Sequence, residues 1–461
     1  MGMSTQFLPY EADQLFLMPL SMRDWLPEGH LAYFISELVD SLDLSAIYAS
    51  YEDETRGAPA FHPAMMIKII FYGLCRGIFS SRKLSRATLE EIPFRVLAAG
   101  HHPDFRTISM FRKRHRPALA ELFKDVVVIC RRVGLAPLAH ISIDGTKVLA
   151  NASKHSAMSY SRMAEEEKKL LSEIEQLLRK GEAQDEAEDL EHGPYLRGDE
   201  LPDELTFREK RLLKIREAKA ALEQETKELA EAQEAERARE EAKAAASGKK
   251  LCGPKPKPTV KEPKDKAQRN FTDPESRIMK DSDNAFVQAY NGQAAVDAEH
   301  QIIVACDATN QAADCPHLQP MIEQVQANTG ETPAECSADT GYFSEQNVEF
   351  LEGQNIDTYI PPDRQCHGNE PIPPVCTDPE KQSLADRQRA KLATPEGRAR
   401  YGLRKQTVEP VFGQIKFARG FRQFLVRGLE NVKAEWALVC LGHNVLKLYQ
   451  HGNRELIFQT S

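Results

Sequence analysis

The chain has 461 residues, of which 41% are hydrophobic and 28% charged, so it can bury a large core and is expected to form two or three domains. No apolar run approaches the length of about 18 residues that a membrane span needs, and the N-terminus lacks a basic region followed by a hydrophobic one. We therefore expect a soluble protein without a membrane partner. The net charge of −9 argues against DNA binding unless the charge is unevenly distributed along the chain.

The segment 103–115 predicts a loop, an N-cap at Thr107 and a helix that carries Arg112, Lys113 and Arg114. It belongs to a basic stretch, 76–116, which holds 10 basic and 3 acidic residues. Such an excess can contact DNA phosphates, giving an affinity that depends on salt and is independent of base sequence. Solvated helix faces are the alternative explanation.

Two short segments predict strands that end in an aspartate. Residues 139–146 alternate apolar and polar side chains and then reach Asp144 and Gly145, the pattern of an inner strand that ends in a turn. Residues 335–342 repeat it with Asp339 and Gly341. Ligands gather at strand ends in open α/β sheets, so both aspartates are candidate site residues. One such turn is weak evidence by itself, because aspartate also ends strands for structural reasons.

The segment 161–250 is an insertion that holds most of the negative charge, with 18 basic and 25 acidic residues and a net charge of 18 − 25 = −7. Leucine and isoleucine recur at helical spacing in 170–178 and 205–229, with Gly and Pro between the two runs. We predict two helices folded back as a hairpin arm. Dimerisation, contact with target DNA or no catalytic role are all open for this arm.

Residues 249–270 are predicted to be an extended linker, because they carry four prolines and a basic excess that favours neither a helix nor a core strand. Beyond it, 286–297 and 301–307 predict a β-hairpin, 318–327 a helix and 358–360 a last short strand.

Three further residues near the predicted hairpin are Asp307, Asp314 and His317. Asp307 also ends a strand, so it is the alternative to Asp339 as the second acid.

The segment 401–416 sets one carboxylate, Glu409, among cations. Glu409 and Lys416 are seven residues apart, about two helical turns, and would share one face of a helix. A carboxylate among cations suits a divalent metal beside a phosphate, whereas a solvated surface helix is the alternative. Pro410 places Glu409 at a helix start or a kink, so the shared face requires that the helix continues through it.

A second basic stretch, 387–427, has 11 basic and 2 acidic residues and includes Arg419 and Arg422. Both basic stretches flank the candidate acids, which favours DNA contact over solvated faces.

In these contexts, Asp144, Asp339 and Glu409 resemble the DDE triad of bacterial insertion-sequence transposases, whose catalytic domain has an RNase H-like fold. The predicted order of elements also matches that fold: strand, insertion, two strands, helix, strand, helix, strand and the Glu409 helix. The segments 61–84 and 103–115 resemble the helical N-terminal domain of this group. The resemblance covers most of the chain outside about 161–270.

The C-terminal motif resembles the family signature of Tyr, two residues, Arg, a short gap, Glu, six residues and Lys, formed here by Tyr401, Arg404, Glu409 and Lys416. The gap after Arg404 holds four residues, where the related pattern usually has three. It is therefore open whether Arg404 or Lys405 takes the basic role.

The resemblance implies an α/β fold: an RNase H-like mixed sheet flanked by helices, with an all-α N-terminal domain and a charged helical insertion after the first strand. The expected units are a helical domain at 1–135, a catalytic domain at 136–160 and 271–450, a helical hairpin at 161–248 and a linker at 249–270.

The implied chemistry is DNA cutting at terminal inverted repeats and joining of the 3′ ends to target DNA, with two Mg²⁺ or Mn²⁺ ions about 4 Å apart. Asp144 would bridge both ions, and Asp339 and Glu409 would each hold one. Lys416 would contact phosphate, while Tyr401 and Arg404 would orient the strand. The expected partners are double-stranded DNA and, when DNA is bound, a second copy of the chain. The expected DNA contacts are Arg112, Lys113, Arg114, Arg419 and Arg422.

Two other classes of protein stay open: an RNase H-like nuclease without transposition activity, and a DNA-binding protein derived from a transposase. Nine scattered cysteines, an odd number, suggest a reducing cytoplasm. A zinc site is a weaker alternative because the spacing fits no standard module. Its ligands would be Cys366, His367 and Cys376 with Cys440 and His443.

Overall fold

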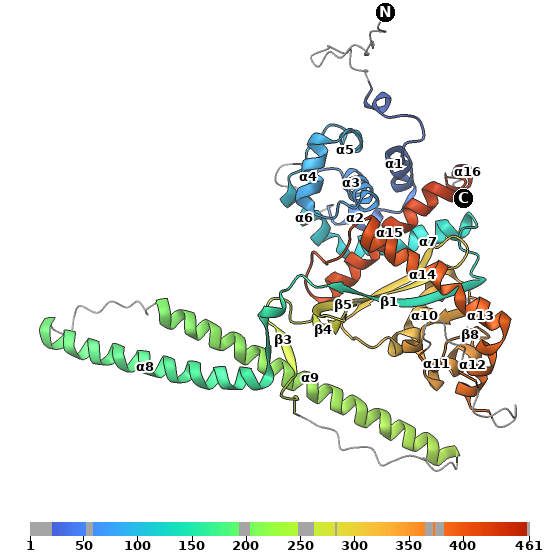
Figure 1. The fold of residues 1–461 in the computed structure, drawn as a ribbon. Coiled ribbons are helices and arrows are strands. Elements are labelled where there is room, and N and C mark those ends of the chain that lie inside the picture. Colours follow the sequence, from blue (N-terminus) through green and yellow to red (C-terminus); the bar gives the residue numbers. More distant parts are fainter. Residues whose placement is uncertain are drawn as a thin grey trace, which may run out of the picture.

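The computed structural model describes residues 21–51, 59–192, 203–247, 262–281, 284–364, 372–373 and 382–458. A mixed β-sheet forms the centre, with N-terminal helices on one side, further helices at its far edge, and two long helices that project away from it (Figure 1). The fold class is therefore mixed α/β with a helical N-terminal region, as the sequence predicts.

The main sheet is centred on β1 (His140–Leu149), which pairs antiparallel with β5 (Phe286–Asp297) and parallel with β7 (Glu335–Ala338). β8 (Asp357–Tyr359) continues the sheet beyond β7, parallel to it. β6 (Ile303–Thr309) and β4 (Arg277–Lys280) both pair antiparallel with β5. The path β6–β5–β1–β7–β8 is the RNase H-like order, with the first strand in the middle.

The N-terminal helices share one hydrophobic core with the sheet. These helices are α1 (Leu31–Ser41), α2 (Ser45–Ala49), α3 (Pro63–Arg76), α4 (Ser81–Glu90), α5 (Ile92–Leu97), α6 (Phe105–Arg114) and α7 (Arg116–Arg132). Between them and the sheet lies α15 (Leu429–His451), which contacts α3, α7 and β6 (Figure 1). Every residue of 438–445 is buried, as expected for a helix enclosed between two layers.

Helices that pack on the strands of the sheet position the C-terminal motif. α10 (Leu318–Thr329) packs on β6, and α14 (Arg404–Gly413) packs on β1 and β5. Further helices are α11 (Glu345–Gly353), α12 (Leu384–Ala393), α13 (Pro395–Gly402) and α16 (Arg454–Phe458).

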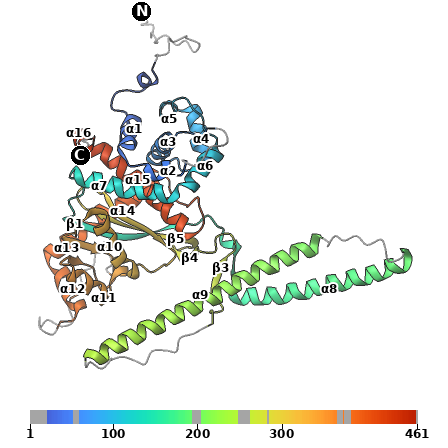
Figure 2. The ribbon, with the colours of Figure 1, turned by 180° about the vertical axis from the view of Figure 1, so that it is seen from behind.

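The insertion forms the predicted pair of helices, α8 (Tyr160–His192) and α9 (Asp203–Ser247), with a small core of its own that includes Met163, Ile215 and Leu222. Glu167 on α8 pairs with Arg216 and Lys219 on α9. Figures 1 and 2 both show that α9 continues past the start of α8 and projects on the other side of the arm's base.

A two-stranded sheet closes the base of the arm, with β2 (Ala157–Ser159) antiparallel to β3 (Gln268–Asn270). The predicted linker therefore ends earlier than residue 270, because its last three residues form a strand. The proline-rich residues 254–258 lie outside the described part of the chain.

Two local predictions are wrong, and one of the two positions that Pro410 allowed for Glu409 is excluded. The N-cap of α6 is Asp104, whose carboxylate accepts a hydrogen bond from Arg106 N, so the helix begins before Thr107. β1 does not end at Asp144 but continues through Gly145 to Leu149, paired with β5 along this length. Pro410 lies inside α14, which continues into a π-helical turn at Gln414–Ala418, so Glu409 is not at a helix start.

Among the described residues, no single helix is long and apolar enough to cross a membrane. Helices α3 and α4 are long and apolar enough only when they are counted together, and the chain bends by 100° between them.

Candidate active site

The register between β1 and β7 brings Asp144 and Asp339 together. Ile143 pairs with Ala338 in the parallel ladder, so each aspartate stands one position beyond that pair. Asp339 is also the N-cap of a short 3₁₀ helix (Thr340–Tyr342), and its Oδ1 accepts a hydrogen bond from Gly341 N at 2.9 Å. Although 195 residues separate these two acids in sequence, the sheet places them on adjacent strands (339 − 144 = 195).

Glu409 reaches the same place from α14, and Arg404 contacts all three carboxylates. The guanidinium nitrogens of Arg404 lie 3.3 Å from Glu409 Oε1, 3.8 Å from Asp144 Oδ2 and 4.0 Å from Asp339 Oδ2. The Arg404 side chain is only 13% exposed. Three acids from three separate segments therefore surround one buried cation.

Burial controls the charge of this cluster. It raises the pKa of Asp144 to about 7, a rise that Asp339 reinforces and Arg404 opposes. Burial likewise raises the pKa of Asp339. The pKa of Arg404 is also raised: burial disfavours its charge, but Asp144, Tyr401 and Asp339 outweigh that effect. The cluster is thus an acidic site held together by one positive charge.

The other residues of the C-terminal motif lie around this centre. The Arg404 guanidinium stands 5.8 Å from the centre of the Tyr401 ring, whereas Lys405 is exposed to solvent. The structure thus puts Arg404, not Lys405, among the acids. Lys416, in the π-helical turn, donates a hydrogen bond at 2.6 Å to the backbone oxygen of Lys147 on β1. Burial lowers the pKa of Lys416.

The predicted DNA contacts divide into exposed and internal residues. Lys113, Arg114 and Arg422 are exposed. Arg112 turns inward, donates to Phe79 O at 2.5 Å and faces the buried Glu435, and burial lowers its pKa.

Arg419 is 9% exposed and donates to Val439 O at 3.2 Å. Neither Arg112 nor Arg419 presents its guanidinium to the surface in this arrangement, so neither can reach a DNA phosphate without a rearrangement.

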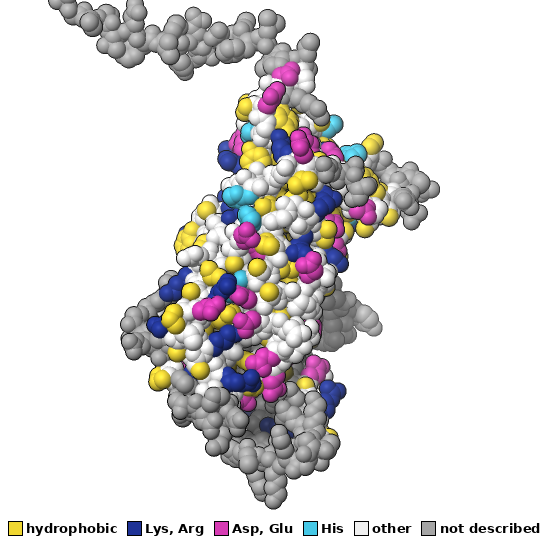
Figure 3. All heavy atoms as spheres, turned by 90° about the vertical axis from the view of Figure 1, so that its right-hand side faces the viewer, with side chains coloured by type: hydrophobic (Ala, Val, Ile, Leu, Met, Phe, Trp, Pro, Cys, Tyr) yellow, Lys and Arg dark blue, Asp and Glu magenta, His cyan; other side chains and the backbone are white. Residues whose placement is uncertain are grey.

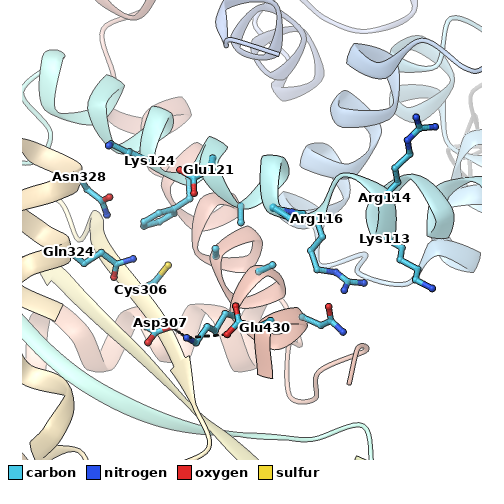
Figure 4. Close-up of a pocket in the computed structure, with 17 residues that line it drawn as sticks. Lys113, Arg114, Arg116, Glu121, Lys124, Cys306, Asp307, Gln324, Asn328 and Glu430 are labelled. Atoms are coloured by element: carbon cyan, nitrogen blue, oxygen red, sulfur yellow. Dashed lines mark ion pairs between the residues drawn. The ribbon is translucent and has the colours of Figure 1, made fainter. Parts of the chain in front are cut away.

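Asp307, the alternative second acid, faces a different cavity. Its carboxylate lies 3.9 Å from Lys433, which also pairs with Glu430 (Figure 4). This cavity, of about 590 Å³, lies between α7, α10, α15 and β6, and Lys113 and Arg114 line it near the α6–α7 junction. Asp307 makes no ion pair with Arg404 among those of the described residues, so the geometry favours Asp339 as the second acid.

A fourth acid, Asp314, stands beside the cluster. It raises the pKa of both Asp144 and Asp339, and its Oδ1 accepts hydrogen bonds from Asn291 at 2.6 Å and Gln293 at 2.9 Å. Asn291 and Gln293 escaped the sequence analysis, although their place in a strand that is otherwise apolar and buried was a usable signal.

The possible metal-ligand atoms around the cluster are carboxylate and amide oxygens, and a hard divalent cation prefers such oxygen ligands. Asn291 Oδ1 is buried and has no hydrogen-bond partner, so an acceptor oxygen is left over at this site. In the described parts of the chain, however, no group of three or more His, Cys, Asp and Glu side chains is already spaced to hold a metal ion. Arg404 supplies the positive charge among the acids instead.

The predicted zinc ligands do not form a site among the described residues. Cys366, His367 and Cys376 lie outside the described part of the chain. Cys440 is a free, buried cysteine. His443 lies in the core, where its Nε2 stands 2.8 Å from Gln301 O. Burial lowers the pKa of His443 to about 3.

Comparison with protein families gives two matches. Residues 20–114 match the Transposase domain (DUF772), and residues 361–449 match the Transposase DDE domain. Both matches are therefore to transposase domains, and the second is a DDE domain. Neither the curated proteins nor the solved structures that were compared with this chain include a match.

The two matched segments lie at opposite ends of the chain. The first spans α1 to α6, and the second spans α12 to most of α15 and contains Arg404, Glu409 and Lys416. Asp144 and Asp339 lie outside both segments, so their place in the site rests on the strand register and on Arg404. On the face that carries α12 and α13, acidic and basic side chains are interspersed (Figure 3).

Proposed function

We propose that this chain is an insertion-sequence transposase that cuts DNA at terminal inverted repeats and joins the 3′ ends to target DNA at a two-metal site. The observation that carries the proposal is the meeting of Asp144, Asp339 and Glu409 around Arg404. A core strand, the end of a neighbouring strand and a helix each contribute one acid, which is the arrangement that a bridging metal pair requires.

Asp144, Asp339 and Glu409 would hold two Mg²⁺ or Mn²⁺ ions, which activate the attacking oxygen and stabilise the leaving oxygen of a phosphodiester. Asp144 is the most buried of the three acids, with 17% of its side chain exposed against 40% for Asp339 and 49% for Glu409. Asp144 would therefore hold metal from the interior of the site, and the two more exposed acids would hold it from the side that faces DNA.

The cations of the C-terminal motif have separate roles in this proposal. Arg404 neutralises the acids in the arrangement described, and with Tyr401 it would orient the DNA backbone beside them. Lys416 stands beside β1 and contacts the phosphate near the cut. A partly buried cation is worth more to a phosphate than one in open water, because the local dielectric constant is lower.

We assign DNA contact outside the site to Lys113, Arg114 and Arg422, whose side chains are exposed. Double-stranded DNA is the substrate, and a homodimer holds the two element ends when DNA is bound. The helical hairpin of α8 and α9 has room to contact a second copy or target DNA, and we assign it no catalytic role.

The proposal is tested with the full-length chain and a DNA fragment that carries the ends of its own insertion sequence. We expect Mg²⁺-dependent nicking at the ends, lost in Asp144→Asn, Asp339→Asn and Glu409→Gln, with DNA binding retained in a mobility-shift assay. Asp307→Asn is the matched control and should cut as the wild type does.

Nicking by any of the three site variants at the wild-type rate would remove that residue from the site. Nicking without joining of the ends to a target plasmid would identify an RNase H-like nuclease instead of a transposase.

A further inference from the structure

Helix α6 presents an outward face without acidic side chains. None of its ten residues is acidic, and its opposite face is buried through Ile108 and Phe111, which pack into the main core. Exposed side chains recur every three or four positions and so form one row along the helix: Arg106, Ser109, Met110 and Lys113. The core thus holds this row in a fixed orientation toward solvent.

One member of the row is a large apolar side chain. Met110 is 70% exposed and lies between Arg106 and Lys113 along the row. A single exposed methionine is common on protein surfaces, but its place between two cations on a helix matches a particular partner. The major groove of DNA presents polar base edges together with the methyl group of thymine, so it contacts basic, hydroxyl and apolar side chains on one helix.

Helix α4 packs against α6 and extends the basic surface. The guanidinium of Arg82 on α4 stands 4.7 Å from the centre of the Phe105 ring, and that of Arg106 stands 5.5 Å from the same ring. Lys83 is also exposed on α4. Among the described residues, no acidic side chain pairs with Arg82, Lys83 or Arg106. The two helices therefore share one surface whose cations are not neutralised.

Neighbouring exposed surfaces have a balanced charge instead. On α7, Glu121 and Lys124 are both exposed, and further along α4, Arg86 pairs with Glu90 at 2.7 Å. Figures 1 and 2 both show α4 and α6 at the outer side of the N-terminal helices, the side toward which α8 projects. The row on α6 is thus accessible to a large partner.

We propose that α6 recognises base sequence at the DNA ends, lying in the major groove with Arg106, Ser109 and Met110 against the base edges. This inference rests on the proposed function, because it names how the same DNA is recognised. The major groove is about 12 Å wide and admits one α-helix. Arg106 matches O6 and N7 of a guanine, Ser109 a polar base edge, and Met110 a thymine methyl group. The cations beside the row then contact the phosphates that border the groove: Arg82, Lys83 and Lys113.

The experiment measures DNA binding by the full-length chain in EDTA, by fluorescence anisotropy. One fragment carries the ends of the insertion sequence, and the other is unrelated DNA of equal length. We expect Arg106→Ala to lower the ratio of the two affinities about tenfold, as for one lost guanine contact. Met110→Ala should lower it about fourfold, the value for one buried methyl group.

Two further variants separate base contacts from phosphate contacts. Lys83→Ala should weaken binding to both fragments equally and reduce the slope of log affinity against log salt concentration by about one. Val128→Ala is the control, because Val128 is 48% exposed on α7 outside this surface, and it should bind both fragments as the wild type does. Circular dichroism checks that each variant is folded.

Modified bases identify the atoms that α6 contacts. Uracil lacks the methyl group of thymine, and 7-deazaguanine lacks the N7 acceptor of guanine. We expect one thymine position in the end fragment where uracil weakens binding by the wild type but not by Met110→Ala. One guanine position should respond to 7-deazaguanine in the wild type but not in Arg106→Ala.

The outcomes separate this inference from the function on which it rests. Unchanged affinity ratios in both Arg106→Ala and Met110→Ala, or equal losses for the two fragments, would overturn base recognition by α6. Equal binding of both fragments by the wild type would overturn it too, and nicking at the ends with Mg²⁺ would still support the proposed function. A wild type that prefers the ends but never cuts them would overturn the proposed function and leave this inference standing.

Discussion

The raised pKa of Asp144 predicts a pH dependence of stability in the metal-free protein. Burial raises this pKa from 3.8 to about 7, so folding favours the protonated acid. Each pKa unit corresponds to about 1.4 kcal/mol, so full ionisation of Asp144 costs the folded protein about 4 kcal/mol relative to the unfolded chain. The destabilisation begins as pH rises past the pKa of 3.8 in the unfolded chain and is complete above the pKa of about 7 in the folded protein. The free energy of unfolding therefore falls as pH rises from about 4 to about 7.

Asp144→Asn removes this titration, because the amide stays neutral at every pH. The free energy of unfolding of the variant, minus that of the wild type, should grow by about 2 to 3 kcal/mol between pH 5 and pH 8. Chemical denaturation in EDTA, followed by circular dichroism at several pH values, measures this difference. EDTA is essential, because a bound metal ion would favour the ionised acid.

Asp43→Asn is the control for this measurement. A hydrogen bond from Ser45 N lowers the pKa of the exposed Asp43, so this acid is ionised in both folded and unfolded chains from pH 5 upward. The difference between this variant and the wild type should therefore stay constant between pH 5 and pH 8. An equally constant difference for Asp144→Asn would refute the account of a buried, partly protonated acid.

Further predictions concern the cation at the centre, the exposed cations and the arm. Arg404→Ala should lower the unfolding free energy in EDTA by about 1 to 3 kcal/mol, since it leaves three acids facing one another; an unchanged denaturation midpoint would contradict this. Lys113→Ala and Arg422→Ala should each reduce the slope of log DNA affinity against log salt concentration by about one, the value for one lost phosphate contact. Arg419→Ala should leave this slope unchanged and lower the thermal stability instead. Ile215→Ala should speed proteolysis of the arm, and hydrogen exchange in the main core should stay at the wild-type rate, because the arm has its own small core.

The sequence predicts the chemistry of the site better than its geometry. Short runs that reach an Asp and a Gly identify the strands of Asp144 and Asp339, although both faces of these strands are buried and the alternation of residue types does not mark a solvent face. The sequence pattern cannot show that these two strands are parallel neighbours, or that Ile143 lies opposite Ala338. Strand pairing is set by contacts between segments that are distant in the sequence. The strand of Asp144 continues through Gly145 for the same reason: β5 pairs with it along this length, and side chains approach the glycine from outside the segment.

Charge patterns show the same limit. Arg112 and Lys113 are neighbours in one basic stretch, yet the first turns toward Glu435 and the second toward solvent. A count of basic residues cannot separate them, because the inward face of α6 is defined only by what packs against it. Arg404 illustrates the converse: the motif predicts its importance, and only the structure shows that it stands among three acids at once.

Helix α15 fixes the spacing between the N-terminal helices and the sheet that carries the candidate site. Because α15 packs against both α3 and β6, the N-terminal helices and the catalytic sheet are parts of one rigid body with no linker between them. In the proposed function, the distance from a DNA segment held by Lys113 to a phosphate at Glu409 would then be fixed by core packing, and not by the reach of a flexible tether. Cutting at a constant number of base pairs from the recognised sequence would follow directly from that rigidity.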